Sequence, residues 1–460
     1  MSASWPRGLT WLVFLGLVSP ILARAAQRRC PVLAPFFCEF RNGTAGAGDT
    51  IRLWRYWSPF PPSGQNRNSL AYRRSASRGA RRAAVFPRFL PADVRVERLT
   101  LIYADLRRIP PAAFANLAVT DIDLQGNQLT DNIAGQAFEG VATTLRRLSL
   151  AWCAITRLNE ALFRGMFSLE ALYLEENAIR SIPNKLFQDL RDLRYISLAG
   201  NRFYDGLPVD VFRYQANLET LDIGYCHLAV IQWNLFSGLW NLKTLDLRGN
   251  YIRELPMQVF YDLNSLDTLK LSHNAIRQLQ SKVLVGLYNL RVFEMEECRL
   301  TDIDADVFMA TKHLRELDLS NNGIARFEPG VLLIGSLHRV HLDGNRLRAV
   351  PSDIAYLFAL RELDLSYNRI ARIDICEFSS IMNLTTLNLR ENPFVCDCDL
   401  FWLRKLRTAL MRRWHPSRPQ PFIPGKCASP PLLKGIVMTN WLDMRCFSNV
   451  YHDTESCEGG

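Results

Sequence analysis

A repeat of about 24 residues dominates the sequence and leaves few folds open to it. The pattern L-x-x-L-x-L-x-x-N/C-x-L occurs thirteen times, at spacings of 23 to 26 residues. The copies begin at Val96, Val119, Leu145, Leu169, Leu193, Leu218, Leu242, Leu266, Leu290, Leu314, Leu337, Leu360 and Leu384. A unit this short cannot bury its apolar face alone, so the copies must stack on one another as a solenoid.

The L-x-L core of each copy alternates with the period of a β-strand, which turns its leucines inward and the residue between them to solvent. A second apolar position follows further along the repeat. It is occupied by Phe114, Phe138, Phe163, Phe187, Phe212, Phe236, Phe260, Phe308 and Phe378. Short parallel strands on one side and bulkier turns on the other predict a curved stack with a concave sheet.

The N/C position of the pattern, here called the ladder position, is the most constrained polar site. It is filled by Asn127, Asn177, Asn201, Asn250, Asn274, Asn322, Asn345, Asn368 and Asn392, and by Cys153, Cys226 and Cys298. A carboxamide both donates and accepts, so it can join the turns of adjacent copies. The three cysteines are spaced about 15 Å apart, which is too far to share a metal or a disulfide, and we interpret them as buried structural thiols.

These motifs resemble the leucine-rich repeat family in its extracellular form, from about Val96 to Cys446. The resemblance implies an α/β solenoid, a curved horseshoe of about 13 repeats with a parallel concave sheet and an irregular or 3-10 convex side. The stretch after the last repeat resembles the family's cysteine-rich cap, which implies the pairs Cys396–Cys427 and Cys398–Cys446. Spacing alone allows three pairings or a zinc site, and a secreted chain favours disulfides.

Five segments follow from this. Residues 1–25 have the basic start, apolar stretch and small-residue cleavage site of a secretory signal peptide. Residues 26–95 are an atypical basic N-terminal flank, expected to be partly disordered. Residues 96–395 are the repeats, 396–446 the cap and 447–460 a flexible tail. No later segment is apolar over the length that membrane insertion needs, and we expect a secreted protein of the extracellular space or matrix.

The N-terminal flank carries eleven arginines against two aspartates between Arg41 and Arg95, whereas residues 96–398 carry 31 basic and 37 acidic residues. The basic stretch predicts a patch for glycosaminoglycans or another anionic surface, with a disordered linker as the alternative. Cys30 and Cys38 are its candidate disulfide. We expect Cys376 in the convex core, find no partner for Cys457, and note glycosylation sequons at Asn42 and Asn383.

The sequence contains no catalytic constellation and no phosphate-binding loop, so we expect no enzyme, no cofactor and no metal. The acidic repeats and the secretion signal argue against a nucleic-acid partner. The outward strand positions instead combine aromatic anchors with acids, and they define the candidate site Trp152, Tyr173, Tyr195, Tyr225, Asp222, Asp246 and Asp318.

We predict that an extracellular protein ligand or receptor with a basic patch docks on this concave face. The alternative is a solvated sheet whose acids pair with neighbouring arginines. The predicted function is therefore a secreted, non-enzymatic binding or adhesion module. The competing hypothesis is the ectodomain of a signalling receptor of Toll-like or neuronal type, with its membrane anchor absent from this sequence.

Overall fold

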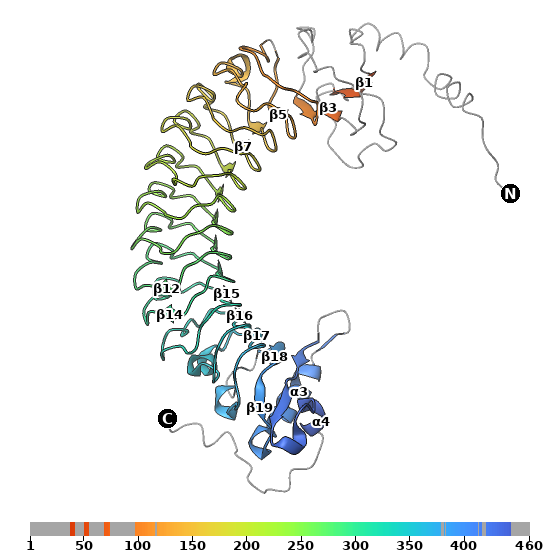
Figure 1. The fold of residues 1–460 in the computed structure, drawn as a ribbon, viewed down its shortest axis with the longest axis vertical. Helices are drawn as coiled ribbons and strands as arrows, with labels where there is room; N and C mark the ends of the chain where they lie inside the picture. The colour runs from red at the N-terminus through yellow and green to blue at the C-terminus, as the bar shows by residue number, and fades with distance from the viewer. Residues whose placement is uncertain are drawn as a thin grey trace, which may run out of the picture. The chain divides into compact units, whose positions relative to one another are not determined.

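A computed structural model describes residues 97–442, except 116, 379–380, 382, 413 and 416–419, and the backbone of three strands nearer the N-terminus. Figure 1 shows the described elements as a ribbon, and the chain divides into two compact units. The first comprises residues 1–179 and 185–193, and the second comprises residues 180–184 and 194–460.

The first unit contains a parallel sheet in the order β3-β4-β5-β6-β7, and an antiparallel pair of β1 with β2. Its elements are β1 (Phe37–Arg41), β2 (Thr50–Trp54), β3 (Ser69–Arg73), β4 (Arg98–Ile102), β5 (Asp121–Asp123), the 3-10 turn η1 (Glu139–Val141), β6 (Arg147–Ser149) and β7 (Ala171–Tyr173). The sequence did not predict β1, β2 and β3, because no alternation of apolar residues marks their segment.

The second unit continues the same architecture with parallel strands in the order β8-β9-β10-β11-β13-β15-β16-β17-β18-β20. These are β8 (Tyr195–Ser197), β9 (Thr220–Asp222), β10 (Thr244–Asp246), β11 (Thr268–Lys270), β13 (Val292–Glu294), β15 (Glu316–Asp318), β16 (Arg339–His341), β17 (Glu362–Asp364), β18 (Thr386–Asn388) and β20 (Phe422–Ile423). Figure 1 shows them along the inner side of a curved stack within this unit.

The outer side of the second unit is built from turns and short elements. They are β12 (Gln278–Leu279), β14 (Asp302–Ile303), η2 (Ser352–Tyr356) and η3 (Ile375–Glu377). Each of the thirteen predicted repeats contributes one parallel strand, so the solenoid with an irregular, partly 3-10 outer side is confirmed.

The core consists of the repeat leucines and the predicted row of phenylalanines, all of which are buried. Neighbouring rings of this row stack: the centroids of Phe114 and Phe138 are 5.3 Å apart, and those of Phe236 and Phe260 are 6.0 Å apart. Because each coil (the chain of one repeat) covers the apolar face of the next, burial in this fold is continuous along the stack.

The asparagines at the ladder position are buried and join adjacent coils as predicted. Asn345 shows the usual arrangement. Its Nδ2 donates to the carbonyls of Leu319 and Leu342, at 2.9 and 3.0 Å, and its Oδ1 accepts the N–H of Ile324 at 3.1 Å. These bonds satisfy backbone groups that would otherwise be buried without partners, and each such unpaired group would cost about 1–3 kcal/mol of stability.

The coils that carry cysteine at the ladder position have a different turn. Cys298 is fully buried, and its thiol donates to the carbonyl of Leu271 at 3.1 Å. The next residue, Arg299, has a φ of +64°, and Cys298 and Leu300 both donate their N–H groups to Oδ1 of Asn322, at 3.0 and 2.9 Å.

The same pattern repeats at the other two cysteines. Ala154 and His227, which follow Cys153 and Cys226, have φ values of +54° and +62°. In each case the asparagine of the following coil accepts two N–H groups. A cysteine coil therefore relies on an asparagine in the coil after it, and burial raises the pKa of each thiol to about 12, which keeps it protonated and unreactive.

The C-terminal part of the second unit contains β19 (Pro393–Val395), η4 (Cys398–Leu400), α3 (Leu403–Arg412), β21 (Lys426–Ser429), η5 (Pro431–Leu433) and α4 (Met438–Leu442). The Cys396–Cys427 disulfide is present, with its Cα atoms 5.5 Å apart. Cys398 is also disulfide-bonded. Its predicted partner Cys446 lies outside the described residues, so that pair stays a prediction.

The expectation that Cys376 is a core cysteine is wrong. Its side chain is half-buried, and its sulfur is in a disulfide. The spacing of the repeats could not reveal this, because a disulfide depends on which cysteines the folded chain brings within bonding distance. In the part of the chain that the structure describes, no helix has the length and apolar character needed to cross a membrane.

Candidate protein-binding face

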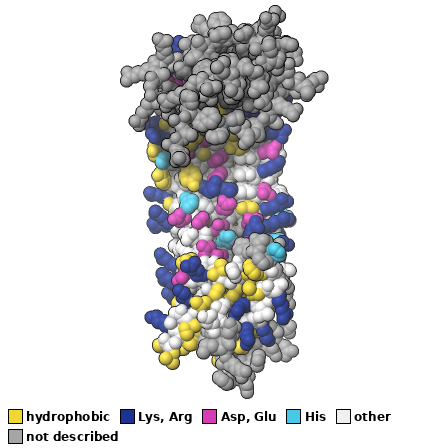
Figure 2. All heavy atoms as spheres, turned by 90° about the vertical axis from the view of Figure 1, so that its right-hand side faces the viewer, with side chains coloured by type: hydrophobic (Ala, Val, Ile, Leu, Met, Phe, Trp, Pro, Cys, Tyr) yellow, Lys and Arg dark blue, Asp and Glu magenta, His cyan; other side chains and the backbone are white. Residues whose placement is uncertain are grey.

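In each unit, the outward side chains of the parallel strands form what is called the strand face here. Figure 2 shows Asp and Glu along the middle of this face and Lys and Arg along its two margins. The acids in the middle were predicted from the sequence as steering charges. Their contacts show that many also have a structural task.

Aspartates at the ends of strands close the turn that follows. Oδ1 of Asp222 accepts the N–H of Gly224 at 3.0 Å, and Oδ1 of Asp318 accepts both the N–H and the hydroxyl of Ser320. The same bond to the N–H two residues on is made by Asp123, Asp246, Asp364 and Asn388. This local capping explains why the motif favours Asp or Asn there, independently of any partner.

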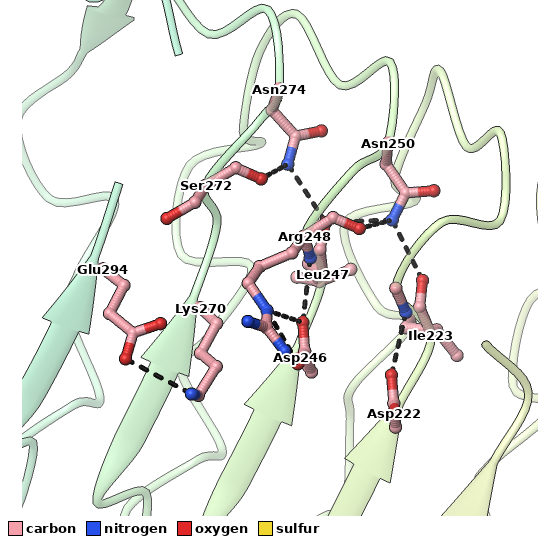
Figure 3. Close-up of polar contacts among 11 residues, drawn as sticks. Asp222, Ile223, Asp246, Leu247, Arg248, Asn250, Lys270, Ser272, Asn274 and Glu294 are labelled. Atoms are coloured by element: carbon pink, nitrogen blue, oxygen red, sulfur yellow. Dashed lines mark hydrogen bonds and ion pairs between the residues drawn. The ribbon is translucent and has the colours of Figure 1, made fainter. Parts of the chain in front are cut away.

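Charges on the face also pair with one another, as Figure 3 shows. Asp246 is only 8% exposed, because the guanidinium of Arg248 lies over it and donates to both carboxylate oxygens at 2.7 to 3.0 Å. Lys270 and Glu294 form a neighbouring ion pair at 3.2 Å. Asp222 and Asp246 are adjacent in register on the parallel strands β9 and β10. Asp222 is the more exposed of the two, so it is the one that a partner can reach.

Asp318 lies on β15, which is separated from β10 by β11 and β13. At the usual spacing between strands, this puts it about 14 Å from Asp246, so it belongs to another part of the face. It is near a titrating group made by His341 and Glu362, which approach to 3.7 Å. This contact raises the pKa of His341 and lowers that of Glu362, while burial, with a contribution from Asp364, raises the pKa of Asp343 to about 6.

The residue before each ladder position adopts a left-handed backbone in every coil. Four of these residues are glycine, and the others include Tyr103, Trp152, Tyr225 and Tyr367. A left-handed conformation costs a non-glycine residue about 1 kcal/mol or more. Large aromatic side chains are therefore held at strained positions on this face, where core packing does not require them.

Tyr225 is the clearest case in the second unit. It is 54% exposed and has a φ of +55°. Its ring lies over Gly249 of the next coil, where an added Cβ would come within 2.2 Å of the ring carbon Cδ1. The glycine thus gives the tyrosine room to lie along the face. Tyr195, on β8, is half-buried on the same face.

The first unit contains the other two predicted aromatics. Trp152 is 51% exposed with a φ of +57°, and its backbone N–H donates to the carbonyl of Glu175 at 3.0 Å. Tyr173 lies on β7 and is half-buried, and this burial raises the pKa of its hydroxyl. These two residues form a candidate patch belonging to the first unit.

An aromatic stack that was not predicted from the sequence includes His227, two residues after Tyr225. The rings of Tyr204 and His227 are 4.8 Å apart, and those of His227 and Tyr251 are 5.5 Å apart. Both tyrosines are exposed. His227 and Tyr251 directly follow the ladder residues of successive coils, and this shared position was a signal in the sequence; Tyr204 lies three positions after its ladder residue and gave no such signal.

Of the remaining predicted sites, some lie within the described residues and others do not. Asn383 is exposed, and its Nδ2 donates to the carbonyl of Phe358 at 2.9 Å. Asn42, Cys30 and the side chain of Cys38 lie outside the described residues, as does the predicted glycosaminoglycan patch. Within the described ranges, no group of three or more His, Cys, Asp or Glu residues is placed to hold a metal ion.

Comparison with known proteins agrees with the repeat and the fold. The family model described as leucine rich repeat matches residues 143–203, 216–276, 241–299 and 335–394, and a second leucine rich repeat model matches residues 311–325. The matched residues are thus leucine-rich repeats, and the chain is similar to extracellular proteins that carry them.

Among curated proteins, lumican of Gallus gallus is 35% identical over 144 residues, covering 31% of this chain and 40% of lumican. Keratocan of Mus musculus is 30% identical over 141 residues, covering 30% of this chain and 39% of keratocan. The chain therefore matches about two fifths of the length of these relatives.

Two solved structures show the same fold. The Toll chain of a Toll–Spatzle complex has a TM-score of 0.62 at 23% identity, covering 81% of this chain and 57% of that one. A chain of the complex of Latrophilin 3, Unc5D and FLRT2 has a TM-score of 0.54 at 21% identity, covering 73% of this chain and 92% of that one.

Proposed function

We propose that this chain is a secreted, non-enzymatic binding or adhesion protein that docks an extracellular protein on its strand face. The supporting observation is Tyr225, an exposed aromatic ring held on a strained left-handed backbone over a glycine. Exposed aromatics are frequent anchors of protein interfaces, and the exposed Tyr204 and Tyr251, which stack on His227, offer a partner further apolar area in the same unit.

The charge on the face favours a partner with a basic patch. Asp222 is half-buried and accepts one backbone N–H, while Asp246 is neutralised by Arg248. We therefore assign the steering role mainly to Asp222, with Tyr225 as the anchor in the second unit. Lumican and keratocan support an extracellular role for this chain, and Toll and FLRT2 in their complexes show a similar fold among proteins that bind other proteins.

Site-specific crosslinking tests this proposal. A photoreactive phenylalanine analogue replaces Tyr225 in one preparation and Trp233, an exposed aromatic outside the strands, in another. In extracellular fluid, we expect a discrete protein adduct from position 225 and none from position 233. The captured partner is then measured against Tyr225→Ala, which should raise its dissociation rate, and Asp222→Lys, which should slow association at low salt. Adducts at both positions alike, or unchanged kinetics, would refute the proposal.

The competing hypothesis, the ectodomain of a signalling receptor, uses the same face. It predicts a longer product of the same gene with a membrane-spanning segment after the cap. Detection of that product on cell surfaces, with no free form in the medium, would favour the receptor.

A further inference from the structure

One margin of the strand face in the second unit contains a hollow lined by basic side chains. The hollow has a volume of about 260 Å³. Two arginines, two histidines, one asparagine and one serine line it, namely Asn289, Arg291, His313, Arg315, Ser336 and His338. Arg291, Arg315 and His338 occupy the same position in three successive coils, directly before β13, β15 and β16. The hollow is therefore a product of coil stacking and not of any one loop.

The charge of this margin changes along the stack. The residue directly before each strand is, in order, Arg194, Glu219, Lys243, Asp267, Arg291, Arg315, His338 and Arg361. In the earlier coils the signs alternate, and Glu219 pairs with both Arg194 and Lys243 at 2.6 Å. Asp267 pairs with Arg291 at 3.3 Å and is the last acid in the row.

After Asp267 the row continues to Arg361 without another acid, and among the described ion pairs Arg291 is the only one of these residues with a carboxylate partner, namely Asp267. Among the ion pairs of the described residues, Arg315 and Arg361 take no part, although both are exposed. The acid next to Arg315 is Glu316, and it is already paired with Arg339. The guanidinium of Arg315 thus lies at the hollow with no carboxylate to neutralise it.

The polar groups around the hollow are oriented by the backbone. Nδ1 of His338 meets the carbonyl of Ser336 at 2.6 Å, so this nitrogen carries the proton and donates it. The hydroxyl of Ser336 donates to the carbonyls of Lys312 and Leu314, and Nδ2 of Asn289 donates to that of Asn264. These bonds fix the rim, and an arginine guanidinium offers the paired donors that sulfate and carboxylate groups accept.

We propose that this hollow binds a sulfate or carboxylate group of an acidic polysaccharide, and that Arg361 binds a further anionic group of the same chain. Arg291 and Arg361 are three coils apart, about 14 Å at strand spacing, which an elongated polyanion can bridge. The lining contains no Phe, Tyr or Trp on which a nucleic-acid base could stack. This site does not include Tyr225, so it can be tested independently of the protein-binding proposal.

The test uses the full chain and a size-defined heparin oligosaccharide. The double variant Arg315→Ala, Arg361→Ala should bind about tenfold more weakly, and the dependence of log Kd on log salt should lose a slope of one to two. The matched control is Arg194→Ala, Lys243→Ala, which removes the same charge from the same row where Glu219 already neutralises it. We expect the control to change the affinity less than about twofold.

Equal losses in the double variant and the control would overturn the proposal, because net charge or the basic segment before residue 96 would then explain binding. Single-stranded DNA of matched charge that binds more tightly and shows the same loss would overturn the assignment to a polysaccharide. Inorganic sulfate that competes as well as heparin at equal charge would reduce the site to small anions and overturn it too.

A second measurement does not depend on variants that fold. Arginine-selective chemical labelling with and without heparin, read by mass spectrometry, should show protection at Arg315 and Arg361 and none at Arg194. Protection at all three residues alike, or at none of them, would contradict a site at the hollow.

Discussion

Removal of single ladder asparagines tests the distinction between cysteine coils and asparagine coils. Asn322 and Asn345 each donate through Nδ2 to three backbone carbonyls. They differ on the accepting side. Oδ1 of Asn322 holds the N–H groups of Cys298 and Leu300, whereas Oδ1 of Asn345 holds only that of Ile324. Asn345→Ala is therefore a control that matches Asn322→Ala in every bond except one.

Both substitutions should destabilise the second unit by several kcal/mol, since each leaves buried backbone groups without partners. Asn322→Ala should cost more by about 1–3 kcal/mol, the penalty for one further buried N–H. The extra loss should be specific to the turn after Cys298, where Arg299 is held in a left-handed conformation.

The assay combines urea unfolding, followed by circular dichroism, with hydrogen exchange of the amides of Cys298 and Leu300. In Asn322→Ala, both amides should lose protection, while in Asn345→Ala they should keep it. Equal unfolding midpoints for the two variants, or protected amides at Cys298 and Leu300 in Asn322→Ala, would refute the reasoning that the following asparagine supports the cysteine coil.

Four more predictions follow from individual contacts. Cys298→Asn should keep or raise the unfolding midpoint in urea, whereas Cys298→Leu should lower stability by about 1–3 kcal/mol, and equal midpoints would count against the ladder role. Cys427→Ser should reduce secretion and lower the Tm by opening the cap, at a cost of a few kcal/mol, and normal secretion would show that the bond is dispensable. Gly249→Ala should lower the free energy of unfolding by about 1–3 kcal/mol, and the double variant with Tyr225→Ala should recover part of this loss; calorimetry can measure both. Burial raises the pKa of Asp343 to about 6, so its contribution to stability should fall as pH rises from 4 to 6. Asp343→Asn should therefore raise the free energy of unfolding by about 1–2 kcal/mol at pH 7 and leave it unchanged at pH 4.

The sequence by itself determined the solenoid, the thirteen strands of its repeats and the identity of the core. Each of these depends on a period that one repeat already contains, so Leu245, Phe236 and Asn250 could be assigned to their layers without knowledge of their neighbours. The pair Cys396–Cys427 followed from a resemblance to a family cap. The strands β1, β2 and β3 could not be predicted, since their segment has no period to detect.

Only the tertiary structure decided which polar side chains are available to a partner. Asp222 and Asp246 have the same place in their repeats, yet Arg248 covers one of them and leaves the other accessible. Arg194 and Arg315 likewise share a position, but the first is neutralised by Glu219 and the second is not. The physical reason is that burial of a core residue depends on its own repeat, whereas the charge presented at the surface depends on which side chains the adjacent coils place within reach.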